Sequence, residues 1–300
     1  PPHALYLHTM LRSTVRLTRH YAPTSYGTPH AGSFLSQFQG GSVTRSTYGN
    51  DEAIALITFD NPGKKNVLTG SMLVQLREAI REVAGMTGKL RALILKGADG
   101  NFSSGLDHDF ALKVSHCYQA TPLTETANYS DGYLMSRFVS DTLWEMACLP
   151  LPVIAVLERN CLGGAAEIAA AADIRVANNN ARMAFMHAHV GITPGFGTVR
   201  FLNDIVGRSI CMELLATGEL IDADRMKKLG LVNYTFDTDD QLAAYVKRFS
   251  DNNCKAVRAS KMIVRDSVDN KGWEERKKSE VQMFLQLWGG KEHRESLVKK

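Results

Sequence analysis

The chain has 300 residues, 44% of them hydrophobic, which is enough to bury a large core in one sizeable domain. Its longest apolar runs are much shorter than the roughly 20 residues that a membrane-spanning helix needs, so we expect no span. The formal charge of +4 comes from four arginines in residues 1–50, which contain no lysine or acidic residue, and the remaining 31 basic and 31 acidic residues cancel. A neutral body argues against nucleic acid as a partner.

The segment 10–49 contains arginines and serines but no acidic residue, a composition typical of an organelle-targeting leader. The same composition, with two prolines and several glycines, also fits a flexible cytosolic tail. We therefore predict an N-terminal extension over residues 1–50. The expected location is the cytosol, with the mitochondrion as the alternative.

The body is predicted to begin with a strand over residues 53–59, which are apolar and β-branched, and the sequence 60–63 (DNPG) predicts the turn after it. Apolar residues three and four apart then predict an amphipathic helix over 71–85. Further strand-like segments follow at 91–96, 152–157, 173–177 and 231–236. Their alternation with helical patterns predicts an α/β core over residues 51–238.

A turn of small residues, 101–107 (NFSSGLD), follows the strand-like run that ends near residue 96. Such a turn offers free backbone N–H groups. Beyond it the segment 121–132 is polar and contains one proline, so we predict a mobile lid beside a site.

A second turn, 162–167 (LGGAAE), runs from a strand into an alanine-rich helix. Backbone N–H groups at a helix N-terminus can hold negative charge, and Glu167 in the first helical turn could act as acid, base or orienting group. Two glycines before a helix are also a common packing solution. The two turns together favour a functional site, because enolate chemistry at a thioester needs two donors that converge on one oxygen.

From residue 239 the chain is compatible with helix almost throughout, so we predict a C-terminal helical region over 239–300 that packs on its own domain or over a neighbouring subunit. The five cysteines are scattered and lack C-x-x-C spacing, which predicts reduced thiols. Histidines and carboxylates show no ligand spacing, so we expect no metal site.

On these residues the chain resembles the enoyl-CoA hydratase/isomerase (crotonase) superfamily. The resemblance covers residues 51–265 and rests on the segments 61–66 (NPGKKN), 102–107 (FSSGLD), 161–167 (CLGGAAE), 172–175 (ADIR) and 191–195 (GITPG). It implies an α/β fold built as a spiral of ββα units, assembly as a homotrimer or a dimer of trimers, and a thioester carbonyl held by two backbone N–H groups.

Carried over residue by residue, the resemblance places the oxyanion-hole amides at Leu106 and Gly164. The implied contacts to coenzyme A and substrate fall on Lys65, Asn66, Val67, Ser103, Ser104, Gly105, Asp107 and Gly163. Lys65 alone would also fit an ordinary solvated surface position. The implied partner is an acyl-CoA substrate, and coenzyme A is part of that substrate rather than a separate cofactor.

The resemblance also bears on the reaction. Hydratases of the superfamily use two glutamates; Glu167 matches the first, and the second position falls on His187. A histidine titrates in a different range from a carboxylate, so this departure argues against hydration. The segments 37–42, 185–187 and 287–290 resemble the superfamily's decarboxylases of ethylmalonyl-CoA.

We therefore expect decarboxylation of ethylmalonyl-CoA to butyryl-CoA, and of methylmalonyl-CoA to propionyl-CoA, without metal, biotin or nucleotide. Glu167 and His187 are the expected catalytic residues. The alternatives are a hydratase, an isomerase or another acyl-CoA enzyme of the superfamily and, from a different class, a non-catalytic oligomeric binding module.

Overall fold

The structure is a computed structural model that describes residues 28–49, 51–116, 131–268 and 272–298. The lid predicted over 121–132 lies outside these residues, except for its last two positions. Those two begin the helix α5 (Asp131–Ala147).

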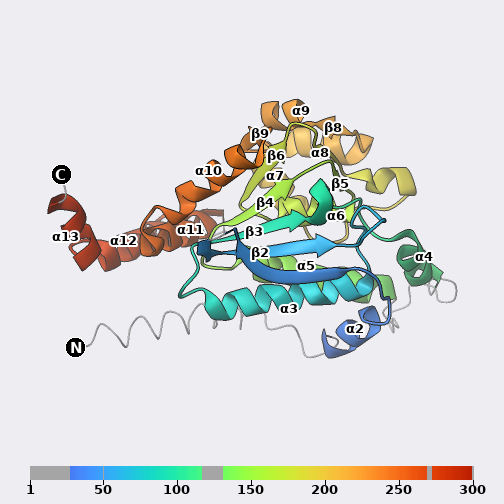
Figure 1. Cartoon of the computed structure of the whole chain (residues 1–300), viewed down its shortest axis with the longest axis horizontal. Coiled ribbons are helices and arrows are strands. Elements are labelled where there is room, and N and C mark those ends of the chain that lie inside the picture. The colour runs from blue at the N-terminus through green and yellow to red at the C-terminus, as the bar shows by residue number, and fades with distance from the viewer. Residues whose placement is uncertain (1–27, 50, 117–130, 269–271, 299–300) are drawn as a thin grey trace.

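A six-stranded sheet forms the centre of the molecule, with strand order β1-β2-β3-β4-β6-β9 (Figure 1). Among the described strands of this sheet, β1 and β2 pair antiparallel and the other neighbours pair parallel. The strands are β1 (Ser42–Tyr48), β2 (Asp51–Asp60), β3 (Ala92–Gly97), β4 (Val153–Leu157), β6 (Ile174–Asn178) and β9 (Tyr234–Phe236). The strands predicted at 53–59, 91–96, 152–157 and 173–177 are confirmed.

The last predicted strand, 231–236, is shorter in the structure, where β9 begins only at Tyr234. The backbone N–H groups of Leu231 and Val232 donate to the carbonyl of Met226 instead. Both side chains are buried in the core. Their apolar character therefore reflects a buried turn rather than a strand.

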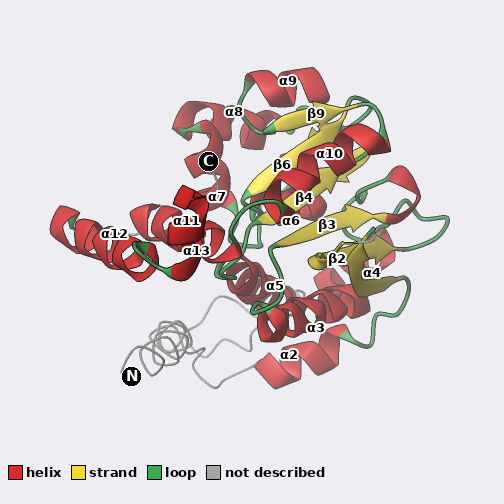
Figure 2. Cartoon of the chain, turned by 60° about the vertical axis from the view of Figure 1, so that its left-hand side comes forward, coloured by secondary structure: helices red, strands yellow, loops and turns green. Residues whose placement is uncertain are grey.

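Both faces of the sheet are buried, and the side chains alternate between two cores. In β3, Leu93 and Leu95 face the larger core, which includes α3 (Gly70–Met86) and α5, whereas Ile94 faces a smaller core with α10 (Asp239–Ser250). Figure 2 shows α3 and α5 on one side of the sheet and α10 on the other. This period-two alternation explains why β4 (VIAVL) and the first four residues of β3 (ALIL) are uninterrupted apolar runs.

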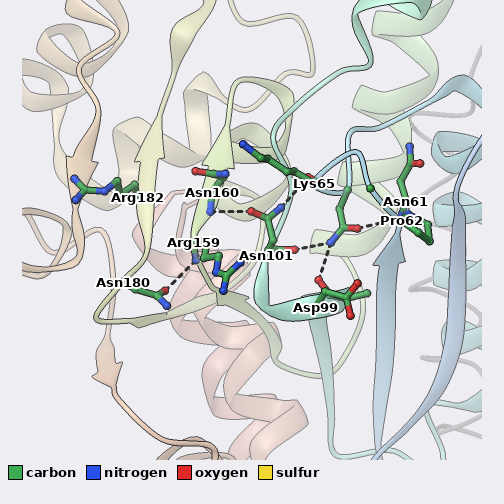
Figure 3. A pocket seen from close by; sticks show the side chains of 12 residues that line it. Asn61, Pro62, Lys65, Asp99, Asn101, Arg159, Asn160, Asn180 and Arg182 are labelled. Atoms are coloured by element: carbon green, nitrogen blue, oxygen red, sulfur yellow. Dashed lines mark hydrogen bonds between the residues drawn. The ribbon is translucent and has the colours of Figure 1, made fainter.

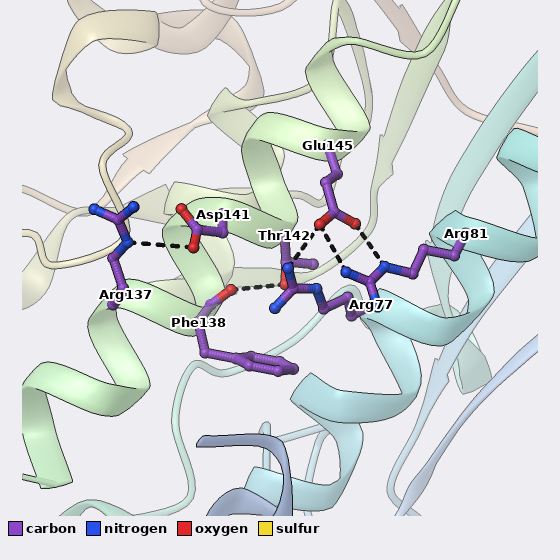
Figure 4. Close-up of polar contacts among 7 residues, drawn as sticks. All are labelled: Arg77, Arg81, Arg137, Phe138, Asp141, Thr142 and Glu145. Atoms are coloured by element: carbon purple, nitrogen blue, oxygen red, sulfur yellow. Dashed lines mark hydrogen bonds and ion pairs between the residues drawn. The ribbon is translucent and has the colours of Figure 1, made fainter. Parts of the chain in front are cut away.

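The predicted helix 71–85 is confirmed as α3, which begins at the cap residue Thr69. An ion-pair cluster ties α3 to α5: Arg77 Nη2 lies 2.6 Å from Glu145 Oε1, and Arg81 Nε lies 2.9 Å from Glu145 Oε2 (Figure 4). The Arg77 guanidinium also stacks 4.7 Å from the ring centre of Phe138. Burial raises the pKa of Glu145, but the hydrogen bonds from Arg81 and Arg77 outweigh it and hold the pKa below its ordinary value.

A second, smaller sheet consists of β5 (Asn160–Leu162), β7 (Arg182–Ala184) and β8 (Ile221–Asp222). Single parallel bridges extend its ladder, one between Ser103 and Cys161 and one between Leu68 and Leu106. Each main-sheet strand β3, β4 and β6 is thus followed by a short segment of this second layer. Segments far apart in the chain become neighbours there.

The N-terminal boundary differs from the predicted extension over residues 1–50. Residues 28–48 contain the helix α2 (Thr28–Leu35) and β1, which pairs with β2 along its length. Ala31 and Leu35 are buried in the larger core. This part of the chain belongs to the body, because its few apolar side chains are sufficient to fix it there.

The predicted C-terminal helical region contains α10, α11 (Cys254–Val268), α12 (Trp273–Leu287) and α13 (Lys291–Val298). The remaining elements are α4 (His108–His116), α6 (Gly164–Ala170), the 3-10 turns η1 (Ala98–Gly100) and η2 (Met186–Val190), α7 (Val199–Val206), α8 (Arg208–Thr217) and α9 (Ala223–Lys228). An ion pair between Lys261 and Asp173 ties α11 to the core. Within the described ranges, no helix is long and apolar enough to cross a membrane.

Candidate active site

The two predicted turns lie against each other at one end of the second layer. Ser103 N–H donates to the Asn160 carbonyl at 2.9 Å, and Leu162 N–H donates to the Ser103 carbonyl at 3.1 Å. A side chain at Gly105, which has a φ of 93°, would place its Cβ 2.8 Å from the Leu162 carbonyl oxygen. The backbone therefore needs glycine at this position to bring the turns together.

The backbone N–H groups of Leu106 and Gly164 are the amides that the sequence placed at the oxyanion hole. Leu68 bonds to the residues on either side of Leu106, to Gly105 O at 2.7 Å and Asp107 N at 2.9 Å. In a parallel bridge this leaves the Leu106 N–H on the side away from Leu68. Within the described chain, neither amide donates a hydrogen bond to the protein.

Helix α6 carries Glu167, one turn after Gly164, and is held at its other end by Arg175. The Arg175 guanidinium donates to the carbonyls of Ala172 at 2.7 Å and Ala169 at 3.3 Å. A cation at this end of a helix bonds carbonyls that otherwise lack a donor. Burial lowers the pKa of Arg175 to about 10, so the side chain remains charged at neutral pH.

The Glu167 carboxylate is 1% exposed and accepts hydrogen bonds from the segment that follows η2. Oε1 accepts from Gly195 N at 3.2 Å, and Oε2 accepts from Phe196 N at 3.0 Å and from Thr198 Oγ1 at 2.6 Å. Thr198 is the N-cap residue of α7, yet its hydroxyl makes no capping bond. That hydroxyl instead helps to fix the carboxylate of Glu167.

His187 completes this cluster. It lies in η2, is 7% exposed, and places Nε2 3.0 Å from Glu167 Oε1. An ionised carboxylate only accepts, so Nε2 carries the proton in this contact. Nδ1 is buried and has no hydrogen-bond partner among the described residues. The two residues predicted to be catalytic are therefore in direct contact, and Nδ1 is the ring nitrogen of His187 that the carboxylate leaves unbound.

The predicted coenzyme A contacts fall into two groups, of which the first is 65–67. Lys65 is exposed, whereas Asn66 is buried with its amide donating to the carbonyls of Asn101 at 2.6 Å and Ala98 at 2.9 Å. The Asn66 side chain thus braces the backbone. The Val67 carbonyl accepts from Asn61 Nδ2 at 2.9 Å.

The second group lies in the turn that carries Leu106. The Ser103 hydroxyl accepts from Gly105 N at 3.2 Å, whereas Ser104 Oγ is buried without a partner in the described structure. Asp107 accepts from Phe110 N at 3.0 Å and lies 3.3 Å from Lys64 Nζ. Partial burial raises the pKa of Asp107, but these hydrogen bonds outweigh it and lower the pKa overall.

Sequence reasoning missed Thr198 and the amides of Gly195 and Phe196 as partners of Glu167. The segment 191–195 was recognised, but nothing in the sequence shows that its continuation returns to α6. A threonine before a helix is ordinarily explained as a cap.

The fold and the paired turns define a class of protein, and comparison with known sequences identifies it. The family model for enoyl-CoA hydratase/isomerase matches residues 49–299. The chain belongs to this family.

Among individual relatives, the chain is similar to the ethylmalonyl-CoA decarboxylases of several vertebrates. It is 30% identical to that of Danio rerio over 274 residues, which cover 89% of this chain and 86% of the relative. Identity to the enzyme of Gallus gallus is 28% over 272 residues, covering 89% and 86% of the two chains. For Homo sapiens the identity is 28% over 272 residues, covering 89% and 83%.

Solved structures agree on the fold. Enoyl-CoA hydratase from Bacillus anthracis superposes with a TM-score of 0.74 at 22% identity, covering 86% of this chain and 95% of that one. A second neighbour, from Thermobifida fusca, was solved as a complex with acetoacetyl-CoA; it has a TM-score of 0.66 at 20% identity, covering 81% and 93%. The predicted crotonase-like α/β spiral is confirmed.

Proposed function

We propose that the chain is an acyl-CoA carboxy-lyase that converts ethylmalonyl-CoA to butyryl-CoA and methylmalonyl-CoA to propionyl-CoA. The observation that carries this proposal is the contact between His187 and Glu167. Where a hydratase would need a second carboxylate, the chain has an imidazole with one ring nitrogen unpaired. The relatives named ethylmalonyl-CoA decarboxylase support the first of these two conversions.

In the proposed reaction the bond between the α-carbon and the carboxylate breaks, and its electron pair moves into the thioester as an enolate. Carbon dioxide leaves. The amides of Leu106 and Gly164 hold the charge on the enolate oxygen, an effect commonly worth several kcal/mol. His187 Nδ1 then donates a proton to the α-carbon, and the ring recovers its proton from water.

Glu167 is proposed to act on His187 rather than on the substrate. Its carboxylate is already occupied by the donors of the 195–198 segment, and its contact with Nε2 fixes the orientation of the ring. The acid would thus be His187, with Glu167 as its positioning residue.

Incubation of the purified chain with ethylmalonyl-CoA in D2O tests the proposal. We expect butyryl-CoA with one deuterium at the α-carbon, and unchanged turnover after treatment with EDTA or avidin because no metal or biotin is involved. Hydration of crotonyl-CoA without loss of carbon dioxide from ethylmalonyl-CoA would instead assign the chain to hydration. No turnover of any thioester would favour a non-catalytic binding module.

A further inference from the structure

The loops that carry the predicted contacts of coenzyme A are braced by side chains from neighbouring loops. Asn101 is central to this bracing, because its amide donates to the Lys65 carbonyl at 2.7 Å and its Oδ1 accepts from Asn160 N at 3.3 Å (Figure 3). The segment 195–198, which holds Glu167, is braced differently. Its support comes from the helix α5, to which the proposed reaction assigns no role.

Two serines of α5 direct their hydroxyl groups at one carbonyl of this segment. Ser136 Oγ donates to the Gly195 carbonyl oxygen, and Ser140 Oγ lies 3.5 Å from the same oxygen. Residues four apart are neighbours on the surface of a helix, so both hydroxyls reach the loop from one face of α5. A carbonyl oxygen has two lone pairs and can accept from both serines.

The hydroxyls of these serines are used differently from most hydroxyls inside helices. A serine or threonine in a helix can bond to the carbonyl four residues earlier, as Thr142 Oγ1 does in α5 with Phe138 O at 2.8 Å (Figure 4). Ser136 and Ser140 instead donate out of the helix. Two hydroxyls that converge on one loop carbonyl indicate that the position of this carbonyl matters.

The carbonyl that accepts from the serines belongs to the peptide group whose N–H contacts Glu167. Gly195 C=O and Phe196 N–H are the two ends of this planar group, and Phe196 N donates to Glu167 Oε2 at 3.0 Å. Because the group is planar, fixing the direction of its carbonyl also fixes the direction of its N–H. Hydrogen bonds to the carbonyl also polarise the peptide group and make its N–H a better donor.

Helix α5 is a firm support for this contact. Glu145 anchors it to α3 through the ion pairs with Arg77 and Arg81. The loop also approaches the helix closely, since a Cβ at Gly197, which has a φ of 74°, would lie 3.2 Å from Ser140 Oγ. The serine hydroxyls are therefore held next to the loop by the packing of the whole helix.

We propose that Ser136 is a positioning residue for the Glu167–His187 pair, an inference that rests on the function proposed above. Its hydroxyl orients one peptide group of the 195–198 segment, and the N–H of that group holds Glu167 Oε2. The other oxygen of the same carboxylate, Oε1, contacts His187 Nε2 at 3.0 Å. Ser140, at 3.5 Å, is the weaker second donor.

Turnover of ethylmalonyl-CoA by variants of α5 tests this proposal. We expect Ser136→Ala to lower kcat about fivefold and to leave KM within about twofold, which is the loss typical of one uncharged hydrogen bond that does not contact the substrate. Alanine is the best helix former, so this substitution keeps α5 intact. Equal kcat for Ser136→Ala and the wild type would overturn the proposal. A higher KM with unchanged kcat would also overturn it, by placing Ser136 in substrate binding.

Two further variants separate the hydroxyl from the fold. Ser136→Thr keeps the hydroxyl at a partly exposed position and should recover most of the wild-type kcat. Thr142→Val is the matched control, because it removes a hydroxyl from the same helix that bonds within α5 rather than to the loop. It should keep the wild-type kcat. A Ser136→Thr variant as slow as Ser136→Ala, or a Thr142→Val variant equally slow, would contradict the proposal.

Amide hydrogen exchange of the full chain without substrate gives a readout that does not depend on the reaction. The N–H groups of Gly195 and Phe196 donate to the buried carboxylate of Glu167, so the segment 191–198 should contain protected amides. We expect Ser136→Ala to accelerate their exchange about threefold or more, and Thr142→Val to leave it unchanged.

The two measurements distinguish failure of this proposal from failure of the proposed function. Unchanged exchange in Ser136→Ala would overturn the positioning role even if the wild type decarboxylates ethylmalonyl-CoA. A wild type without decarboxylation, together with faster exchange in Ser136→Ala, would refute the proposed function and still support the role of Ser136 in holding Glu167.

Discussion

His187 Nε2 lies 3.0 Å from Glu167 Oε1, and this contact assigns different tasks to the two ring nitrogens. One nitrogen is bound to the carboxylate. The other, Nδ1, has no partner among the described residues and is the proposed proton donor. The predictions below follow from this division and from the backbone that surrounds it.

Removal of the imidazole should abolish proton transfer while leaving thioester binding intact. We expect His187→Gln to lower kcat by about 10²- to 10⁴-fold with little change in KM, the range typical of a general acid. Glu167→Gln should lower kcat less and should change the pH profile, because it alters only the environment of the ring. Steady-state kinetics on ethylmalonyl-CoA between pH 5 and 9 provide the test. A Glu167→Gln variant more impaired than His187→Gln would reverse the two roles.

Thr198 should act through Glu167. Thr198→Val removes the 2.6 Å hydrogen bond to Glu167 Oε2 and keeps the shape of the side chain. A hydrogen bond to a charged group is worth about 1.5–3 kcal/mol, and we expect a part of this, about tenfold, to be lost from kcat. Thr198→Ser is the matched control and should restore turnover. Equal rates for the valine and serine variants would remove Thr198 from the mechanism.

The two glycines of the oxyanion turns should respond differently to alanine. A Cβ at Gly164 would lie 2.8 Å from Phe196 Cε2, a side chain that can be shortened. A Cβ at Gly105 would meet the Leu162 carbonyl oxygen at 2.8 Å and would also require a φ of 93°. We expect Phe196→Leu to restore part of the stability and turnover of Gly164→Ala, and to restore neither in Gly105→Ala. Thermal unfolding and turnover of the two double variants provide the measurement.

Glu145 should make the free energy of unfolding depend on pH in the acid range. Folding lowers the pKa of Glu145. Its contribution to the free energy of unfolding is therefore complete above the unfolded-state pKa of about 4.3, and it is lost as the pH falls through the folded-state pKa. Glu145→Gln should cost about 2 kcal/mol at pH 7, because it leaves the buried Arg77 without its partner. The difference from the wild type should vanish in strong acid.

Urea unfolding at pH 7 and at pH 3 measures this effect. Glu82→Gln breaks the more exposed pair with Arg45 and serves as the control, for which we expect less than about 1 kcal/mol at either pH. A loss for Glu145→Gln that is the same at both pH values would rule out the carboxylate as its cause.

The C-terminal helices should form a contact between copies of the chain. Trp273, Phe284 and Trp288 are 73%, 52% and 61% exposed, a concentration of large apolar side chains at α12 and its C-terminal end. We expect a homotrimer or hexamer by light scattering and a smaller species for Trp288→Glu. Trp288→Tyr, which remains largely apolar, is the control and should keep the assembly. A monomeric wild-type chain would contradict this prediction.

Much of the main sheet could be predicted from the sequence, because β2, β3, β4 and β6 each contain a cluster of apolar residues that is buried in the two cores. The second sheet could not, since β5, β7 and β8 have only three, three and two residues, which is too short for a periodic pattern. The pairing of β1 with β2 was also missed, because β1 has one buried residue, Val43, and otherwise presents polar side chains.

For the site, the sequence identified the segments but could not show their contacts. Glu167 and His187 were singled out as separate candidates, and only the structure joins them. The partners at 195–198 depend on a chain reversal after η2 that leaves no local signature. The backbone of Arg159 could not be predicted either, because nothing in the sequence shows that this arginine adopts a positive φ, which is more typical of glycine.

The bridge between Ser103 and Cys161 joins the two turns through main-chain hydrogen bonds alone. The donors that would hold the charge are main-chain N–H groups, which every residue except proline supplies, whereas the proposed proton source is a single side chain on η2. A single substitution at position 187 could therefore change the reaction while the amides of Leu106 and Gly164 stay in place. The single substitution His187→Glu tests this idea, with hydration of an unsaturated thioester as the activity to be measured.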